Sequence, residues 1–326
     1  MAYQNVGTPR FYVNVLEWLA SNDAITLPSD HFRTLPVTFT TIDGYWTNAT
    51  DSPIGAFNDK SFFAVLGHID ADDLIATHGA GNDWISSDGK ISINCSPFPG
   101  YWIPSYDGFS IGSFDGTDRV SIGWRFTSIA KFGSILLGTY YDMPNAPNLS
   151  LTMSREYGGI NEFTTHNGSS MSNTMWSKPP MWGNLGAWEL HSSNTYPQSL
   201  TKSGRRTWDL KFSYMDDGDL WGANQYLGRV EWGGQTGIVD SEDIGYGEYY
   251  NENILAENSF FSQVWHKTLG GTLPFIFQPD GDGDTPGSGN NNPDQFAICK
   301  FKDSSLKATQ SAFNVYDISL SIEEVW

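Results

Sequence analysis

Residues 259–271 read Ser-Phe-Phe-Ser-Gln-Val-Trp-His-Lys-Thr-Leu-Gly-Gly, and this stretch decides how the surrounding segments must be arranged. Its apolar face recurs with the period of a helix and consists of Phe260, Phe261, Val264, Trp265 and Thr268. Asn258 or Ser259 can cap the first free N–H groups, and Gly270 or Gly271 can end the helix in the left-handed conformation. The stretch therefore predicts one helix near residues 259–269.

Strand-like segments lie on both sides of this helix. Residues 205–214 alternate apolar and polar side chains, which indicates a strand with one dry face. Residues 273–277, 296–301 and 315–326 also read as strands. A lone helix among strands must cover a sheet or plug a barrel, because its apolar stripe has nothing else to pack against.

The order of these elements resembles that of the distal tail and minor tail proteins of long-tailed bacteriophages. The resemblance is carried by Arg206-Thr207-Trp208-Asp209-Leu210-Lys211-Phe212, Gly270-Gly271-Thr272-Leu273-Pro274-Phe275 and Ile322-Glu323-Glu324-Val325. It implies a β-barrel or sandwich tail domain with one helix, in a subunit that joins the tail tube to the tail tip or baseplate. It also implies a ring of copies, with a hexamer expected and a trimer as the alternative. Added β-sandwich domains in that family point outward, often toward host-surface glycans.

Composition narrows the function classes further. The chain has 326 residues, with 18 Lys and Arg against 37 Asp and Glu and a net charge of −19. Nucleic-acid binding is not expected, because phosphate contacts require a basic face. An anionic membrane surface would repel the chain, and no run of about 18 apolar residues is present to insert into a bilayer. The aromatic content of 15% with only 17% charged residues favours short strands and turns over disorder.

The first part of the chain, residues 1–144, predicts a β-sandwich of the jelly-roll type. Residues 11–15 read as its first strand, and residues 16–20 either continue that strand or form a helical turn. Asp-Gly at 115–116 separates alternating runs at 109–114 and 120–126, which is a strong hairpin signal. Short strands at this spacing are typical of sandwiches.

The second part, residues 145–326, is the predicted tail-type domain. Two prolines and several turn-forming residues within 141–148 place the boundary there. A hairpin of residues 149–156 and 160–165 is expected to open this domain, with Gly158-Gly159 as its turn.

Two cysteines, Cys95 and Cys299, each lie in an apolar run, and buried free thiols are the expected state. Their number rules out a disulfide framework or a zinc site. The N-terminus shows no basic region followed by an apolar one, so no signal peptide is expected. These features predict synthesis in a cytoplasm, and the resemblance to phage tail proteins implies incorporation into a virion.

The sequence carries only weak signals for a catalytic or metal site. Asp280, Asp282 and Asp284 alternate as in calcium loops, but Thr285 and Asn291 stand where such a loop needs Gly and Glu. An acidic hairpin tip is therefore the favoured interpretation, and calcium is the alternative. The six histidines lack metal-ligand spacing. Residues 108–112 match the letters of a serine-nucleophile turn, but no helix follows them. We therefore do not expect an enzyme.

Aromatic residues outside the strands offer two further candidate sites. Possible glycan contacts in loop-like stretches of the first domain are Trp46, Trp84, Tyr101 and Trp102. Sugar rings stack on such aromatic planes, although core or interface packing is the favoured reading. Residues 171–197 predict an arm or long loop that touches a neighbouring subunit, with possible contacts Trp176, Trp182 and Trp188.

The resemblance thus implies a structural protein of a tailed phage. Its expected partners are copies of itself and the neighbouring tail-tube, tail-tip or baseplate proteins, with host-surface glycans as a further candidate. A secreted-type polysaccharide-active enzyme with a binding module is one alternative, and it would need an acidic cleft. A capsid decoration or tail-fibre protein is another. Copy number per particle distinguishes decoration from a tail-tip ring.

Overall fold

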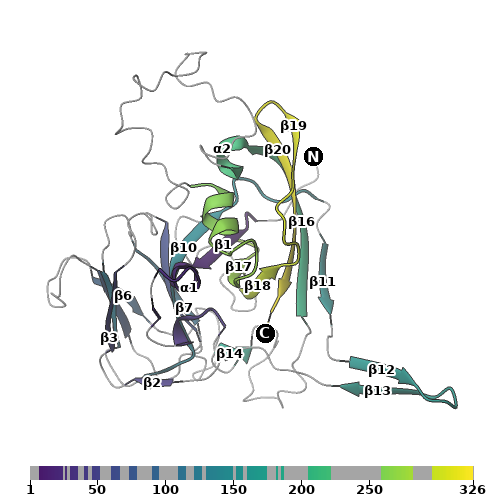
Figure 1. Ribbon diagram of the computed structural model, residues 1–326, viewed down its shortest axis with the longest axis horizontal. Coiled ribbons are helices and arrows are strands. Elements are labelled where there is room, and N and C mark those ends of the chain that lie inside the picture. Colours follow the sequence, from purple (N-terminus) through teal and green to yellow (C-terminus); the bar gives the residue numbers. More distant parts are fainter. Residues whose placement is uncertain are drawn as a thin grey trace.

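The computed structural model describes the following residues: 7–24, 26–27, 30–35, 40–42, 46–51, 60–66, 73–78, 90–94, 109–114, 121–126, 130–149, 152–156, 160–174, 181–182, 185–186, 205–221, 258–281 and 296–325. Within them the fold is mainly β, as predicted, with a few short helical segments lying against one large antiparallel sheet (Figure 1).

The large sheet has the order β11-β16-β20-β18-β17-β1-β10-β4-β7, and β19 pairs with β20. Its strands are β1 Arg10–Asn14, β4 Ser61–Leu66, β7 Phe109–Phe114, β10 Ser134–Asp142, β11 Thr152–Glu156, β16 Arg205–Asp216, β17 Phe275–Gln278, β18 Ala297–Phe301, β19 Ala308–Ala312 and β20 Val315–Glu324. The four strands predicted from the C-terminal third of the sequence are thus confirmed as β16, β17, β18 and β20.

Smaller sheets accompany the large one. Their orders are β3-β8-β5-β6, β2-β9, β12-β13 and β14-β15. The strands are β2 Thr40–Ile42, β3 Trp46–Asp51, β5 Asp73–His78, β6 Lys90–Asn94, β8 Ser121–Phe126, β9 Ala130–Phe132, β12 Ile160–Thr164, β13 Ser170–Thr174, β14 Met181–Trp182 and β15 Leu185–Gly186.

The first strand joins the two halves of the chain. β1 pairs with β10 on one side and with β17 on the other, so Phe11 lies opposite both Tyr141 and Phe277. All five residues of β1 are buried, which is what a central strand requires. β10 and β11, which lie on either side of the predicted boundary at residue 144, belong to the same sheet.

The pairing in two predicted hairpins is wrong, although all four of their strands form, as β7, β8, β11 and β12. β7 pairs with β4 in the large sheet, whereas β8 pairs with β3 and β5 in another sheet. β11 pairs with β16, whereas β12 pairs with β13. In both cases a local turn signal suggested that neighbouring segments pair, but the strands form ladders with partners distant in sequence or with the next strand along.

The predicted helix forms, and it is a π-helix, η3 Phe261–His266, preceded by one α-helical residue. The Ser259 hydroxyl accepts a hydrogen bond from the N–H of Ser262 at 3.2 Å, so the expected N-terminal cap is present. At the other end Gly270 and Gly271 take φ angles of 65° and 86°, as expected for the stop. A Cβ on Gly271 would lie 2.8 Å from Cβ of Phe301, so the close approach also requires glycine.

This helix covers the centre of the sheet. Phe260 and Val264 are fully buried in a core with residues from β1, β16, β17, β18 and β20. The Phe11 ring lies 5.7 Å from that of Phe260 and 5.5 Å from that of Phe275. The predicted packing of the apolar face of the helix against a sheet is therefore confirmed, although Phe261 is only partly buried.

The helix is not the only one. α1 Val15–Ser21 follows β1 directly, which resolves the ambiguous segment at residues 16–20 in favour of a helix. A 3-10 helix, η1, spans Asp30–Phe32, and α2 spans Asp217–Leu220 at the end of β16. The prediction of a single helix was wrong, because short capped turns carry too little periodicity to detect.

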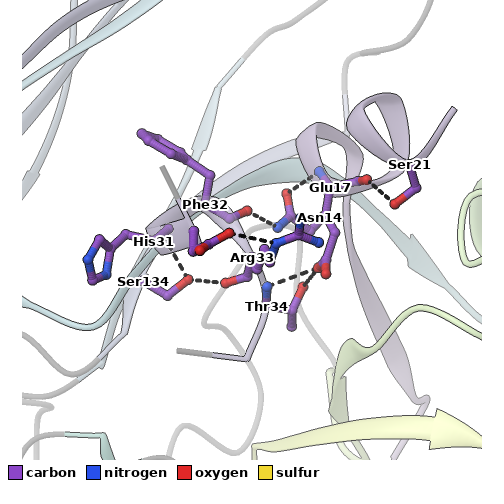
Figure 2. A network of polar contacts seen from close by, with 9 residues as sticks. Asn14, Glu17, Ser21, His31, Phe32, Arg33, Thr34 and Ser134 are labelled. Carbon is purple, nitrogen blue, oxygen red and sulfur yellow. Dashed lines mark hydrogen bonds and ion pairs between the residues drawn. The ribbon is translucent and has the colours of Figure 1, made fainter. Parts of the chain in front are cut away.

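A polar network fixes α1 to the loop around η1 (Figure 2). Asn14 caps α1 by accepting from the N–H of Glu17 at 3.4 Å and donates to the carbonyl of Phe32 at 2.8 Å. The Glu17 carboxylate accepts from the N–H and the hydroxyl of Thr34 at 2.9 and 2.7 Å. Because its bonds go to a loop of its own chain, this buried carboxylate has a structural role.

A buried ion pair brings two segments of the phage-tail resemblance together. Nη2 of Arg206 in β16 donates to Oε1 of Glu324 in β20 at 3.0 Å, and its backbone N–H donates to Oε2 at 2.9 Å. The same Nη2 also donates to the carbonyl of Phe296 at 2.8 Å. Both side chains are nearly inaccessible to solvent. These residues therefore hold β16 and β20 together inside the molecule.

Candidate functional site

The most exposed large apolar side chains of the described residues gather on a few elements. They are Leu149, Met153, Phe163, Met171, Tyr214 and Phe313, each more than half exposed. Exposed aromatic and Met side chains of this size are typical of surfaces that bind another protein. We call Phe163 with Met171 the arm patch, and Tyr214 with Phe313 the tip patch.

The arm patch lies on the β12–β13 hairpin, which projects away from the large sheet (Figure 1). Phe163 and Met171 are cross-strand partners, so both point to one face of the hairpin. They are 52% and 51% exposed. The turn is closed by hydrogen bonds between Thr165 and Ser169, with Gly168 in the left-handed conformation. The hairpin therefore presents an ordered apolar pair to its surroundings.

The tip patch lies at the end of β16 where α2 begins. A bulge interrupts the β16–β20 register between Phe212 and Met215, both of which are buried. Tyr214 lies within this bulge with φ 63° and is 81% exposed. The bulge has thus turned outward a side chain that the regular alternation would have placed on the inner face beside Phe212.

Phe313 occupies the turn between β19 and β20 at the same end of the ladder. It is 78% exposed, and the next residue, Asn314, takes φ 56°. The carbonyl of Asn314 accepts from the N–H of Asp217 at 3.1 Å, which fastens the turn to α2. This hydrogen bond holds the turn that carries Phe313 beside the start of α2.

The edge strand β11 carries the remaining exposed apolar residues. Met153 lies opposite Trp208 of β16, and Leu149 precedes the strand. In the described sheet order β11 is a terminal strand. Trp208 is buried whereas Met153 is more than half exposed, so the core ends at β16 and β11 extends beyond it.

A buried lysine lies between η3 and β10. Nζ of Lys267 donates to Oε1 of Gln263 at 2.8 Å and contacts Oγ1 of Thr139 at 3.3 Å. Burial lowers the pKa of Lys267 to about 7. The pKa of the neighbouring His266 is also lowered, by burial and by the charge of Lys267. Because its ammonium is enclosed on the core side of the helix, Lys267 affects stability rather than surface chemistry.

Acidic side chains gather at the start of α2. Asp216 caps this short helix by accepting from the N–H of Gly218 at 2.9 Å. Burial raises the pKa of Asp217 and of Asp219, and the charge of Asp216 raises both further. Over the part of the chain that the structure describes, no group of three or more His, Cys, Asp or Glu side chains is placed to hold a metal ion.

None of the helices in the described residues is long and apolar enough to cross a membrane.

The structure places only some of the sequence-predicted site residues. Trp46 begins β3 and Trp182 ends β14, so neither lies in a loop as expected. Asp280 follows β17 and lies against Gly7, and Cys299 is a buried free thiol, as predicted. The predicted residues outside the described ranges are Trp84, Cys95, Tyr101, Trp102, Trp176, Trp188, Asp282 and Asp284.

Sequence reasoning did not identify the arm and tip patches. Phe163 belongs to a segment that was correctly predicted as a strand, but alternation alone does not reveal that neither face of this hairpin is covered. Tyr214 continues the alternating pattern of residues 208–212, so a bulge was not expected. Phe313 precedes an Asn, and that pair was the one available signal for a tight turn.

Comparison with known proteins found no match among protein-family models, curated protein sequences or solved structures.

Proposed function

We propose that this chain is a structural protein of a tailed-phage virion, a subunit that binds copies of itself in a ring at the distal end of the tail. Its other partners in this proposal are the tail-tube protein and the tail-tip or baseplate proteins. The chain acts through assembly and carries out no reaction.

The interior of the molecule supports this proposal. The segments that carry the resemblance to distal tail proteins meet in one core: Arg206 pairs with Glu324, and Gly271 lies against Phe301. Phe275 follows in the same core, with its ring 4.7 Å from that of Phe301. The order of these segments along the sequence therefore accompanies the packing of one helix on one sheet.

The observation that carries the proposal is the arm patch. A projecting hairpin with an ordered Phe–Met pair on one face exposes apolar area that would be costly to leave in water. Met and aromatic residues are enriched at protein–protein contacts. A binding surface for another protein explains the arm best.

The position of the chain in a particle tests the proposal. Quantitative mass spectrometry of purified virions is expected to find a handful of copies per particle, and gold-labelled antibody is expected to mark the distal tail. Hundreds of copies spread over the head would instead identify a decoration protein. Absence of the chain from the virion would refute the proposal.

Host-surface glycan contact is a second role that the same proposal includes. Its candidate residues are Trp46, Trp84, Tyr101 and Trp102. Binding of the purified chain to host cell envelopes, lost when these aromatic residues are replaced by Ala, would support this role. Unchanged binding by those variants would show that the glycan contact is made by other residues.

A further inference from the structure

We infer that Asn167, in the turn of the β12–β13 hairpin, is a site of spontaneous covalent modification, at which the side-chain amide is converted to a carboxylate through a cyclic imide. This inference does not depend on the proposed function. It concerns the chemistry of the chain itself, and its co-reactant is water.

The sequence singles out this position. His166-Asn167-Gly168-Ser169 contains the one Asn-Gly pair among the 326 residues. The reaction begins when the backbone nitrogen of the residue after Asn attacks the side-chain carbonyl carbon, and a Cβ on that residue hinders the approach. Glycine has no Cβ. A Cβ placed at Gly168 would meet nothing within 4 Å, so the surroundings of the attacking nitrogen are also open.

The turn leaves the reacting groups accessible to water. Asn167 and Gly168 are both exposed, and their hairpin projects away from the large sheet (Figure 1). The backbone N–H and the hydroxyl of Thr165 donate to the carbonyl of Ser169 at 2.8 and 3.1 Å, which closes the turn. The hydrogen bonds of this turn do not use the Asn167 amide, so they do not hold that side chain away from the backbone.

One hydrogen bond of the turn controls the rate. The N–H of Gly168 donates to the carbonyl of Thr165 at 2.9 Å, and the nitrogen must give up this bond before it can attack. The end of an exposed hairpin opens locally at a small cost in free energy, because few buried contacts are lost. The folded chain is therefore expected to react more slowly than the unfolded chain, but without losing the rest of its fold.

The reaction consumes water and releases ammonia. Hydroxide takes the proton of the Gly168 N–H, and the electron pair of that nitrogen forms a bond to Cγ of Asn167. The bond from Cγ to Nδ2 breaks, and Nδ2 leaves as ammonia after taking a proton from water, which restores the hydroxide. Water then opens the imide at one of its two carbonyls. Opening at the side-chain carbonyl gives Asp, and opening at the main-chain carbonyl gives isoaspartate.

Both products change the end of the hairpin. Each adds a negative charge to a chain whose net charge is already −19. Isoaspartate also routes the backbone through an extra methylene carbon inside the turn. The geometry of the hydrogen bond from Gly168 to Thr165 is then lost, whereas the Asp product can keep it.

Peptide mapping by mass spectrometry tests the inference on the purified wild-type chain. After incubation in mildly alkaline buffer, the peptide that contains Asn167 is expected to acquire the mass of an acid in place of an amide, as separate Asp and isoaspartate forms. Conversion should be slower in mildly acidic buffer, because hydroxide starts the reaction. Asn145 is the internal control: it is exposed, it precedes Ala146, and its Nδ2 donates to the carbonyl of Tyr214 at 3.5 Å.

Two variants separate this route from other sources of the same mass. N167Q keeps an amide at the position but would have to close a larger ring, so its peptide is expected to keep its mass. N167D supplies the Asp product from the start and should elute with one of the two wild-type forms. Circular dichroism confirms that both variants fold.

Three results would overturn the inference. The first is a wild-type peptide that keeps its amide in alkaline buffer, and the second is conversion at Asn167 no faster than at Asn145. The third is a product that contains Asp but no isoaspartate, because the imide gives both. Failure of the chain to assemble or to enter a virion would refute the proposed function and leave this chemistry unaffected.

Discussion

At the scale of single residues, two side chains lie in environments that are unusual for their type. Lys267 is enclosed between η3 and β10, and Tyr214 is held in water by a bulge. Both arrangements reduce the stability of the isolated chain. Each arrangement can therefore be tested by replacing one side chain.

Replacing Lys267 by Met is expected to stabilise the chain below neutral pH. The pKa of Lys267 is about 7 when folded and near 10.5 when exposed, so the unfolded chain binds more protons between these values. The penalty for burying the amine is complete below pH 7 and falls as the pH rises toward 10.5. K267M should therefore melt higher than wild type at pH 6, with the difference shrinking by pH 10. A difference that does not vary with pH would contradict this account.

Substitutions at Tyr214 measure the strain directly. In a strand Ala is normally more stable than Gly, but at a left-handed φ the order reverses. Y214G should therefore be more stable than Y214A by about 1 kcal/mol in urea denaturation. Equal stability of the two variants would indicate that the bulge relaxes in solution.

At the scale of elements, the Arg206–Glu324 pair connects β16 to β20 across 118 positions of sequence. Removing one partner leaves a buried charge without its counterion, which costs about 3–5 kcal/mol. R206M and E324L are each expected to lower the free energy of unfolding by that amount. The double variant R206M/E324L should recover most of the loss, and denaturant titration of all three against wild type checks this.

The strands and the helix also show which structural features could be predicted from the sequence. Period and capping located η3, β16, β18 and β20, because these signals are local and strong. Strand pairing could not be predicted, because β7 and β11 pair with strands that are distant in the sequence. β7 pairs with β4, and β11 pairs with β16. The patches were missed for the same reason, since exposure of Phe163 depends on where its hairpin points.

At the scale of the whole molecule, charge opposes the proposed assembly. Each chain carries a net charge of −19, so copies repel one another at long range. The arm patch is apolar, so salt does not weaken a contact that it makes with a partner. Raising NaCl from about 0.05 M to about 0.5 M shortens the screening length and should strengthen self-association. Sedimentation at both salt concentrations checks this, and dissociation at high salt would indicate an interface built on ion pairs.

The mass of the purified chain in solution tests the central claim most directly. Light scattering coupled to size-exclusion chromatography is expected to show a discrete multiple of the chain mass for the wild type, with a hexamer favoured. The F163D/M171D variant is expected to elute at the mass of one chain while keeping its fold. A wild type that is monomeric at all concentrations, or an arm variant that assembles unchanged, would contradict the account.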